Sequence, residues 1–130
     1  MLEQRELLSV NQIAFDALKG QINIAGTPDA EQVTVSMDSL SVVRVRAQSI
    51  DGLVEATFQR ASVSSIYYFG GEGNDRFVNN TSIPAVALGE GGNDYLSGGS
   101  GDDSLQGGIG HDELVGNAGD IQVKDAKLAG

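Results

Sequence analysis

Residues 98–106 read GGSGDDSLQ and residues 107–115 read GGIGHDELV, so one nine-residue pattern occurs twice without a gap. Residues 70–78, GGEGNDRFV, repeat the pattern, and residues 89–97, GEGGNDYLS, keep its frame with one glycine displaced. The sixth position is always Asp and the eighth is apolar: Asp75, Asp94, Asp103 and Asp112, with Phe77, Leu96, Leu105 and Leu114. A G-G-x-G-x-D run arises by chance at about one position in 10⁵, so the copies indicate a repeat architecture.

Two poorer copies extend the array to residues 70–124. Residues 79–88 lack every glycine and contain one extra residue, whereas residues 116–124 place Ile121 where Asp is expected. In each good copy, glycine permits positive φ or close backbone approach in a six-residue turn. The fifth position is Asn74, Asn93, Asp102 or His111, and the Asn and Asp side chains tolerate the left-handed region. The last three residues form a minimal strand.

The period predicts how the repeats stack. Successive strands are expected on opposite sides of a flattened coil, so that 18 residues complete one turn and every second repeat lies in register. Asp94 then lies between Asp75 and Asp112 on one edge, which predicts two good cation sites there. On the other edge Asp103 faces the acid-free copy 79–88, and only Asp120 could complete a poor site.

Carboxylates and backbone carbonyls are hard oxygen ligands, which suit Ca²⁺ better than Mg²⁺, Zn²⁺ or a soft metal. The acids beside the turns, such as Glu72, Glu90 and Glu113, are expected to be solvated. The predicted metal-site residues are the repeat carboxylates and the turn glycines: Asp75, Asp94, Asp103, Asp112, Asp120, Gly71, Gly73, Gly91, Gly99, Gly101, Gly108 and Gly110.

Residues 70–115 resemble the hemolysin-type (RTX) calcium-binding nonapeptide repeat, G-G-x-G-x-D-x-U-x, and residues 70–124 do so more loosely. The resemblance implies a parallel β-roll (a β-solenoid) with Ca²⁺ between stacked turns, in an exported bacterial protein that is extracellular or on the cell surface. Residues 26–34, GTPDAEQVT, are similar to an eroded copy with Glu31 in the acidic position. Residues 2–9 resemble the L-E-P-R-x-L-L-S segment of some bacterial surface proteins, with Gln4 in place of Pro.

The residues before the array have a different composition, because all but three of the 18 glycines follow residue 69. Residues 21–69 contain four runs with apolar residues at every second position and a fifth, continuous run at residues 66–69, with Asp51-Gly52 as a hairpin turn. Residues 1–20 are expected to be helical or disordered, and residues 125–130 form a tail. The predicted fold is all-β: short strands with a hairpin, then a β-roll of about three turns over residues 70–124.

The composition excludes several classes of function. A net charge of −10 argues against nucleic acid and anionic lipid as partners, and the absence of cysteine excludes disulfides and thiolate catalysis. His111 is the only histidine and occupies a turn position, and no H-E-x-x-H, G-x-S-x-G or Walker sequence is present. No catalytic or other cofactor-binding residue is therefore predicted, and no membrane insertion.

The sequence predicts a calcium-binding repeat module that is not an enzyme and whose folding is coupled to Ca²⁺. Without the ion, the turn carboxylates repel one another and few apolar side chains are available to offset chain entropy. Two alternatives remain open. The chain is a repeat fragment of a secreted hydrolase, or it is a surface adhesion module that uses calcium for rigidity.

Overall fold

The computed structural model describes residues 12–50, 52–116 and 121–124. These residues form an all-β structure, as predicted, with one short 3-10 turn at Arg60–Ser62 and no α-helix. None of the described residues belongs to a helix long and apolar enough to cross a membrane. The strands are β1 (Gln12–Asp16), β2 (Gln21–Ala25), β3 (Glu31–Met37), β4 (Val42–Ser49), β5 (Gly52–Gln59), β6 (Ser65–Phe69), β7 (Arg76–Asn79), β8 (Ala85–Leu88), β9 (Tyr95–Ser97), β10 (Asp103–Gln106), β11 (Glu113–Val115) and β12 (Ile121–Lys124).

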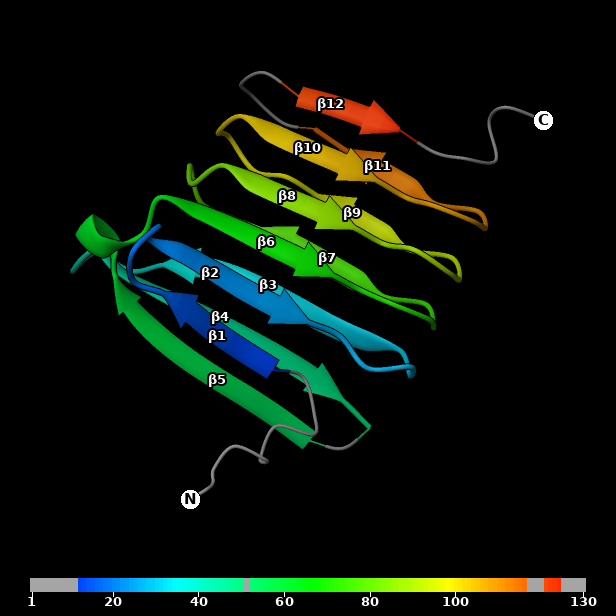
Figure 1. Cartoon of the computed structure of the whole chain (residues 1–130), viewed down its shortest axis with the longest axis horizontal. Helices are drawn as coiled ribbons and strands as arrows, with labels where there is room; N and C mark the ends of the chain where they lie inside the picture. Colours follow the sequence, from blue (N-terminus) through cyan, green and yellow to red (C-terminus); the bar gives the residue numbers. More distant parts are fainter. Residues whose placement is uncertain (1–11, 51, 117–120, 125–130) are drawn as a thin grey trace.

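The strands form two mixed sheets of six strands each. One sheet has the order β1-β2-β6-β8-β10-β12 and the other β11-β9-β7-β3-β4-β5. From β6 onward the chain alternates between the sheets, and in each sheet the successive strands pair in parallel, as Figure 1 shows for β6, β8 and β10. The same parallel pairing joins β2 to β6 and β3 to β7, so both sheets continue across the composition change near residue 70.

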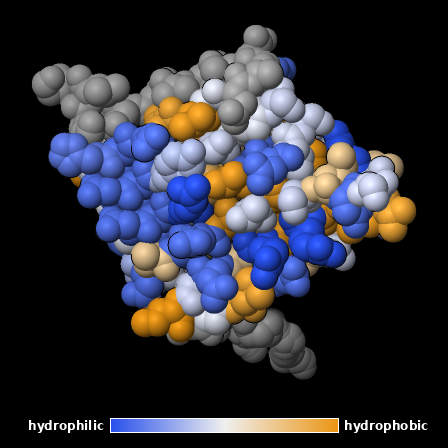
Figure 2. Space-filling view, turned by 180° about the vertical axis from the view of Figure 1, so that it is seen from behind, coloured by the Kyte–Doolittle hydropathy of each residue, from blue (hydrophilic) through white to orange (hydrophobic). Residues whose placement is uncertain are grey.

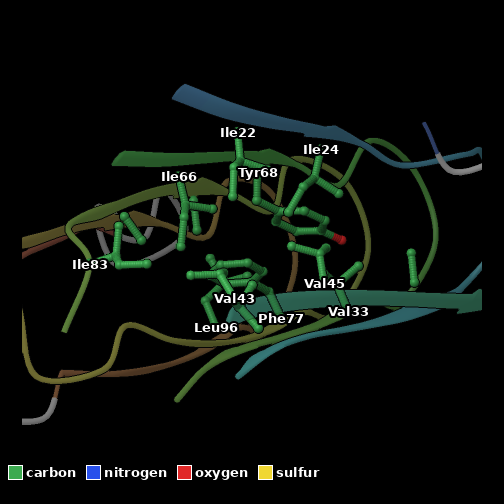
Figure 3. Close-up of a cluster of buried hydrophobic side chains, with 14 of the residues drawn as sticks. Ile22, Ile24, Val33, Val43, Val45, Ile66, Tyr68, Phe77, Ile83 and Leu96 are labelled. Atoms are coloured by element: carbon green, nitrogen blue, oxygen red, sulfur yellow. The ribbon is translucent and has the colours of Figure 1, made fainter. Parts of the chain in front are cut away.

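Side chains from the two sheets interdigitate in one apolar core (Figure 3). At its centre the rings of Tyr68 and Phe77 stack with centroids 4.8 Å apart and planes 11° from parallel. Each good repeat contributes its eighth residue: Phe77, Leu96 and Leu105 are buried, and Leu114 packs against the core while partly exposed. The inward position predicted for the short strands is therefore confirmed. The remaining buried apolar residues come mostly from residues 22–87: Ile22, Ile24, Val33, Val35, Val43, Val45, Ala47, Val63, Ile66, Ile83, Ala85 and Ala87.

Residues 1–20, expected to be helical or disordered, contain a strand in the part that the structure describes. Residues 12–16 form β1, which pairs antiparallel with β2 so that Phe15 lies opposite Ile22. The Phe15 ring also contacts that of Phe58 on β5, with centroids 5.2 Å apart. Pairing and burial thus override the weak local preference for helix. Residues 1–11 and the tail 125–130 lie outside the described residues.

The hairpin predicted around residue 52 is confirmed. Strands β4 and β5 pair antiparallel along their whole length, with Ser49 opposite Gly52, whose φ is 126°. On the outer face of this hairpin Arg44 and Arg46 both contact Glu55, with N–O distances of 3.7 and 3.2 Å. These three side chains are about half exposed, so the ion pairs add little stability.

Candidate metal centre

Four loops stack along one edge of the molecule, each leading into a strand of the second sheet. They form the right edge of Figure 1, and their outer atoms contribute the hydrophilic surface at the left of the reverse view in Figure 2. An acidic residue follows each loop: Glu31 after 26–30, Asp75 after 70–74, Asp94 after 89–93 and Asp112 after 107–111. We call these four residues the acidic column. The strand registers keep it aligned, because Tyr95 lies opposite both Arg76 and Glu113 despite the extra residue in 79–88.

Hydrogen bonds join successive members of the acidic column. The backbone N–H of Glu31 donates to Oδ1 of Asp75 at 3.1 Å, and that of Asp75 donates to Oδ1 of Asp94 at 2.9 Å. The N–H of Asp94 donates to Oδ1 of Asp112 at 2.8 Å. These bonds hold each carboxylate at the space between two turns. The stacking order is the one that the nine-residue period predicts.

The second oxygen of these carboxylates is the feature that points to a ligand. Oδ2 of Asp75, of Asp94 and, on the other edge, of Asp103 is buried without a hydrogen-bond donor. Leaving a buried carboxylate oxygen unsatisfied is costly, and a cation or a proton removes that cost. The three aspartates are themselves 2–5% exposed.

Other oxygens gather beside the unsatisfied ones, at the first glycine of a repeat. A Cβ atom at Gly70 would lie 2.7 Å from Asp75 Oδ2, 3.0 Å from the Gly89 carbonyl oxygen and 3.1 Å from Tyr68 Oη. No three His, Cys, Asp or Glu side chains of the described residues form one cluster. A cation here would therefore combine carboxylate oxygens with backbone carbonyls, which is the hard-oxygen ligand set that Ca²⁺ prefers. The residues present fit that ion.

Burial also changes the protonation of these aspartates. Desolvation, with the charges of Glu31 and Asp94, raises the pKa of Asp75 to about 8. Desolvation is also the main cause that raises the pKa of Asp94 to about 7 and that of Asp103 to about 6. Without a cation, the carboxyl groups of Asp75 and Asp94 hold protons near neutral pH, whereas that of Asp103 holds one only in mildly acidic solution. A bound dication would reverse this preference and release the protons.

Asp103 occupies the opposite edge, directly after the turn of residues 98–102. Its Oδ1 accepts a hydrogen bond of 3.1 Å from the backbone N–H of Ala85, in the copy without acids. Its other neighbour in the sheet is Ile121. Among the described residues, the acidic side chain whose charge acts on Asp103 is its neighbour Asp102, which helps to raise the pKa of Asp103. The predicted partner Asp120 lies outside the described residues.

The second position of each turn requires positive φ, and one copy meets this requirement without glycine. In three copies the residue is glycine, with φ between 78° and 90°, as at Gly71, Gly99 and Gly108. In the copy 89–97 it is Glu90, with φ of 71°. Gly91 itself has no positive φ, and a Cβ atom there would lie 2.6 Å from Oε1 of Glu72. Of the other predicted glycines, Gly73 and Gly110 have positive φ, while Gly101 closely approaches the backbone of Ser82.

Replacing Glu90 by glycine is expected to stabilise the protein by about 1 kcal/mol. A non-glycine residue in the left-handed region costs roughly 1–2 kcal/mol. This cost is larger than the free energy that glycine loses because it adds entropy to the unfolded chain. Urea denaturation at fixed Ca²⁺ measures the change. Glu72→Gly is the matched control, since Glu72 is also an exposed turn acid but has no positive φ. Equal effects of the two variants would contradict the backbone argument.

The fifth position of the turns behaves differently from the prediction. None of Asn74, Asn93, Asp102 and His111 has positive φ. Instead, Oδ1 of Asn74 accepts a 2.8 Å hydrogen bond from the backbone N–H of Asn93, and Oδ1 of Asn93 accepts one of 2.9 Å from that of His111. The recurring asparagines thus form a second ladder beside the acidic column. Their fixed period was the sequence signal for this role.

Glu31 begins the acidic column but differs from the aspartates. Its Oε1 accepts hydrogen bonds from the backbone N–H and the hydroxyl of Thr27, at 2.9 and 3.2 Å. Its Oε2 accepts a 3.3 Å hydrogen bond from the Tyr68 hydroxyl. Burial raises the pKa of Glu31, and these donors oppose the rise. Strand β3 places Glu31 in register with Asp75, as the resemblance of residues 26–34 to an eroded repeat implies.

Comparison with known proteins identifies the repeats. Residues 88–120 match the RTX calcium-binding nonapeptide repeat in four copies. No curated protein and no solved structure matches the chain. The matched region contains Asp94, Asp103 and Asp112, whereas Asp75 and Glu31 precede it.

Proposed function

Because the chain carries RTX nonapeptide repeats, which bind Ca²⁺, we propose that the ion binds along the acidic column and that its binding is coupled to folding of the repeats. The observation that carries the proposal is the pair of buried Oδ2 atoms, of Asp75 and Asp94, that have no donor. The alternation of strands between two sheets supports the β-roll that the resemblance implies. The RTX repeat is a calcium-binding module and not a catalytic family.

The chain's own residues prepare the site in two ways. Oδ1 of each repeat aspartate in the column is bonded to the preceding turn, so Oδ2 is already fixed beside the space between turns. The turn glycines add no side chain of their own there, where a Cβ atom at Gly70 or Gly89 would lie 2.7 or 2.5 Å from Oδ2 of Asp75 or Asp94. Asp75 and Asp94 would hold a Ca²⁺ ion through their donor-free Oδ2 atoms, and the ion would supply the positive charge that these buried carboxylates lack. Since these oxygens converge only when the turns stack, binding favours the folded chain.

The coupling fits a protein that works outside the cell. Calcium modules of the extracellular kind have Kd of about 10⁻⁴ to 10⁻³ M, and binding to the folded state alone adds RT ln(1 + [L]/Kd) to its stability. RTX repeats are characteristic of secreted bacterial proteins. In this proposal the repeats remain incompletely folded where calcium is scarce and fold after export, in a protein that is extracellular or on the cell surface.

Isothermal titration calorimetry of the full chain tests the binding. After dialysis against a chelator, addition of Ca²⁺ should release or absorb heat and saturate in the millimolar range or below, with at least two ions per chain. Mg²⁺ at the same concentrations should give little heat, because it requires a more compact octahedral ligand set. Absence of Ca²⁺ binding at several millimolar would contradict the proposal.

The Ca²⁺-free protein is expected to become more stable as the pH falls from 8.5 to 5. The folded-state pKa values of Asp75, Asp94 and Asp103, about 8, 7 and 6, exceed the ordinary value. Each raised pKa contributes stability that is complete below the unfolded-state pKa and is lost as the pH rises through the folded-state pKa. The gain should be on the order of 2 kcal/mol after allowance for solvent screening.

Urea denaturation in chelator at several pH values measures this dependence, and saturating Ca²⁺ is the control. Bound Ca²⁺ replaces the protons, so the stability of the calcium form should not rise as the pH falls. If the Ca²⁺-free protein lost stability as the pH fell from 8.5 to 5, the aspartates would not be buried with raised pKa values as described.

A further inference from the structure

The turn between β7 and β8 lacks both the glycines and the aspartate of the repeat, yet its side chains are densely bonded. Asn79 and Thr81 are 1% and 6% exposed. Asn79 ends β7, on the edge opposite the acidic column, and the next turn to stack on it is that of residues 98–102. Hydrogen bonds made by the polar side chains of this turn take the place of the glycines and the aspartate that the repeat has in its other copies.

The Asn79 amide bridges two stacked turns. Its Nδ2 donates to the carbonyl oxygen of Ile83, in its own turn, at 3.0 Å and to that of Gly98, in the next turn, at 2.9 Å. Its Oδ1 accepts hydrogen bonds from the backbone N–H and the hydroxyl of Thr81, at 3.1 and 2.6 Å. The Thr81 hydroxyl in turn accepts a 3.1 Å hydrogen bond from the N–H of Ile83. Both amide hydrogens and both acceptor sites of Asn79 are used.

The next turn is built directly on this network. The backbone N–H of Ser100 donates to the Thr81 carbonyl oxygen at 3.2 Å. A Cβ atom at Gly99 would lie 2.5 Å from the same oxygen and 2.7 Å from that of Asn79. The turn that precedes Asp103 therefore stacks closely on a turn whose shape is already fixed by side-chain hydrogen bonds.

The two edges satisfy inter-turn oxygens in different ways. In the acidic column, carboxylate oxygens without donors lie between the turns, whereas beside Asn79 two carbonyl oxygens from successive turns point at one amide nitrogen. The donor-free carboxylate oxygen on this edge, Asp103 Oδ2, lies beside Gly98 in the next turn and not in the turn of residues 79–84. We infer that the Asn79 amide occupies the place of a metal ion, so this turn is calcium-independent within a calcium-binding coil. The inference rests on the proposed function. It assigns to residues 79–84 the role of a fixed template on which the following repeats fold when Ca²⁺ binds.

Asn79→Asp tests the inference with almost no change of shape. The carboxylate places oxygen against the Ile83 and Gly98 carbonyls, so in chelator the urea midpoint should fall clearly below that of the unmodified chain. Ca²⁺ should restore most of this loss, because carbonyl and carboxylate oxygens now surround one position. Calorimetry should then count one more bound ion than in the unmodified chain.

Asn79→Ala and Thr81→Val are the comparison variants. Both remove hydrogen bonds without adding a ligand, so each should lower the midpoint equally in chelator and in Ca²⁺ and bind no additional ion. Thr81→Val nearly keeps the side-chain shape and serves if the other variants fold poorly. If Asn79→Asp lost as much stability in Ca²⁺ as in chelator and bound no additional ion, the inference would be overturned. Failure of the unmodified chain to bind Ca²⁺ would instead refute the proposed function. Calorimetry of the unmodified chain and of the Asn79→Asp variant therefore distinguishes the two failures.

Discussion

Asp94→Asn is expected to stabilise the Ca²⁺-free protein and to destabilise the Ca²⁺-bound protein. Asp94 lies in the middle of the acidic column, where its Oδ1 accepts from Asp75 and its N–H donates to Asp112. Its Oδ2 is buried without a donor, and burial raises its pKa to about 7. Asparagine keeps the Oδ1 acceptor and removes the buried charge. The same change removes one of the two buried, donor-free carboxylate oxygens on which the proposed site rests.

The two effects should be large enough to separate. At pH 8 the unfolding free energy in chelator should rise by about 1 kcal/mol, because an unpaired buried carboxylate is eliminated. Calcium affinity should fall at least about 100-fold, since even residues that only orient metal ligands contribute 10- to 100-fold. Urea denaturation in chelator and in Ca²⁺, with calorimetry, measures both. Glu113→Gln removes one exposed charge nearby and should change neither value appreciably. Changes of the same sign in both forms would refute the account of the column.

Phe77→Ala is expected to cost about 3–5 kcal/mol of unfolding free energy, in the range typical of buried aromatic truncations. Phe77 is fully buried and stacks on Tyr68 of the opposite sheet, with ring centroids 4.8 Å apart. On either side in its own sheet it pairs with Val33 and Leu96. The cavity would therefore lie where the strands before the array meet the first repeat. Because Tyr68 also donates to Glu31, the loss should weaken the start of the acidic column.

Phe69→Ala is the matched control for the core variant. Phe69 follows Tyr68 on β6 but is 40% exposed, so its truncation should cost about 1 kcal/mol or less. Both variants are compared by urea denaturation in saturating Ca²⁺. Equal losses would show that the two sheets do not share the core described above.

The parts of the structure that the sequence predicted are those fixed by local periodicity. A residue at every ninth position must recur in the same place on each strand, so Phe77, Leu96 and Leu105 could be placed in the core. The same period aligns Asp94 with Asp112, because residues in register in a parallel sheet share one edge. Asp75 joins them although it lies nineteen and not eighteen residues before Asp94. The hairpin at Gly52 was visible for a similar reason, since its turn dipeptide separates two runs of alternating residues.

The parts that escaped prediction depend on contacts between distant or unrepeated residues. Residues 12–16 become a strand because β2 offers pairing and Phe58 offers packing, neither of which the local spacing reveals. Asn79 and Thr81 occur once, so no period marks them, and their role arises from the carbonyl of Gly98 in the following turn. The asparagines at the fifth position do repeat in the sequence. Asparagine is favoured both by a left-handed backbone and by hydrogen bonds between turns, so the residue type alone does not distinguish the two roles.

The central claim is that Ca²⁺ binding completes the folding of the repeats. Far-UV circular dichroism of the full chain at pH 8, titrated with Ca²⁺ from chelator, tests it most directly. We predict a β-sheet signal that grows with Ca²⁺, saturates, disappears again with excess chelator and does not respond to equal Mg²⁺. A spectrum and a urea midpoint that are the same with and without Ca²⁺ would contradict the claim.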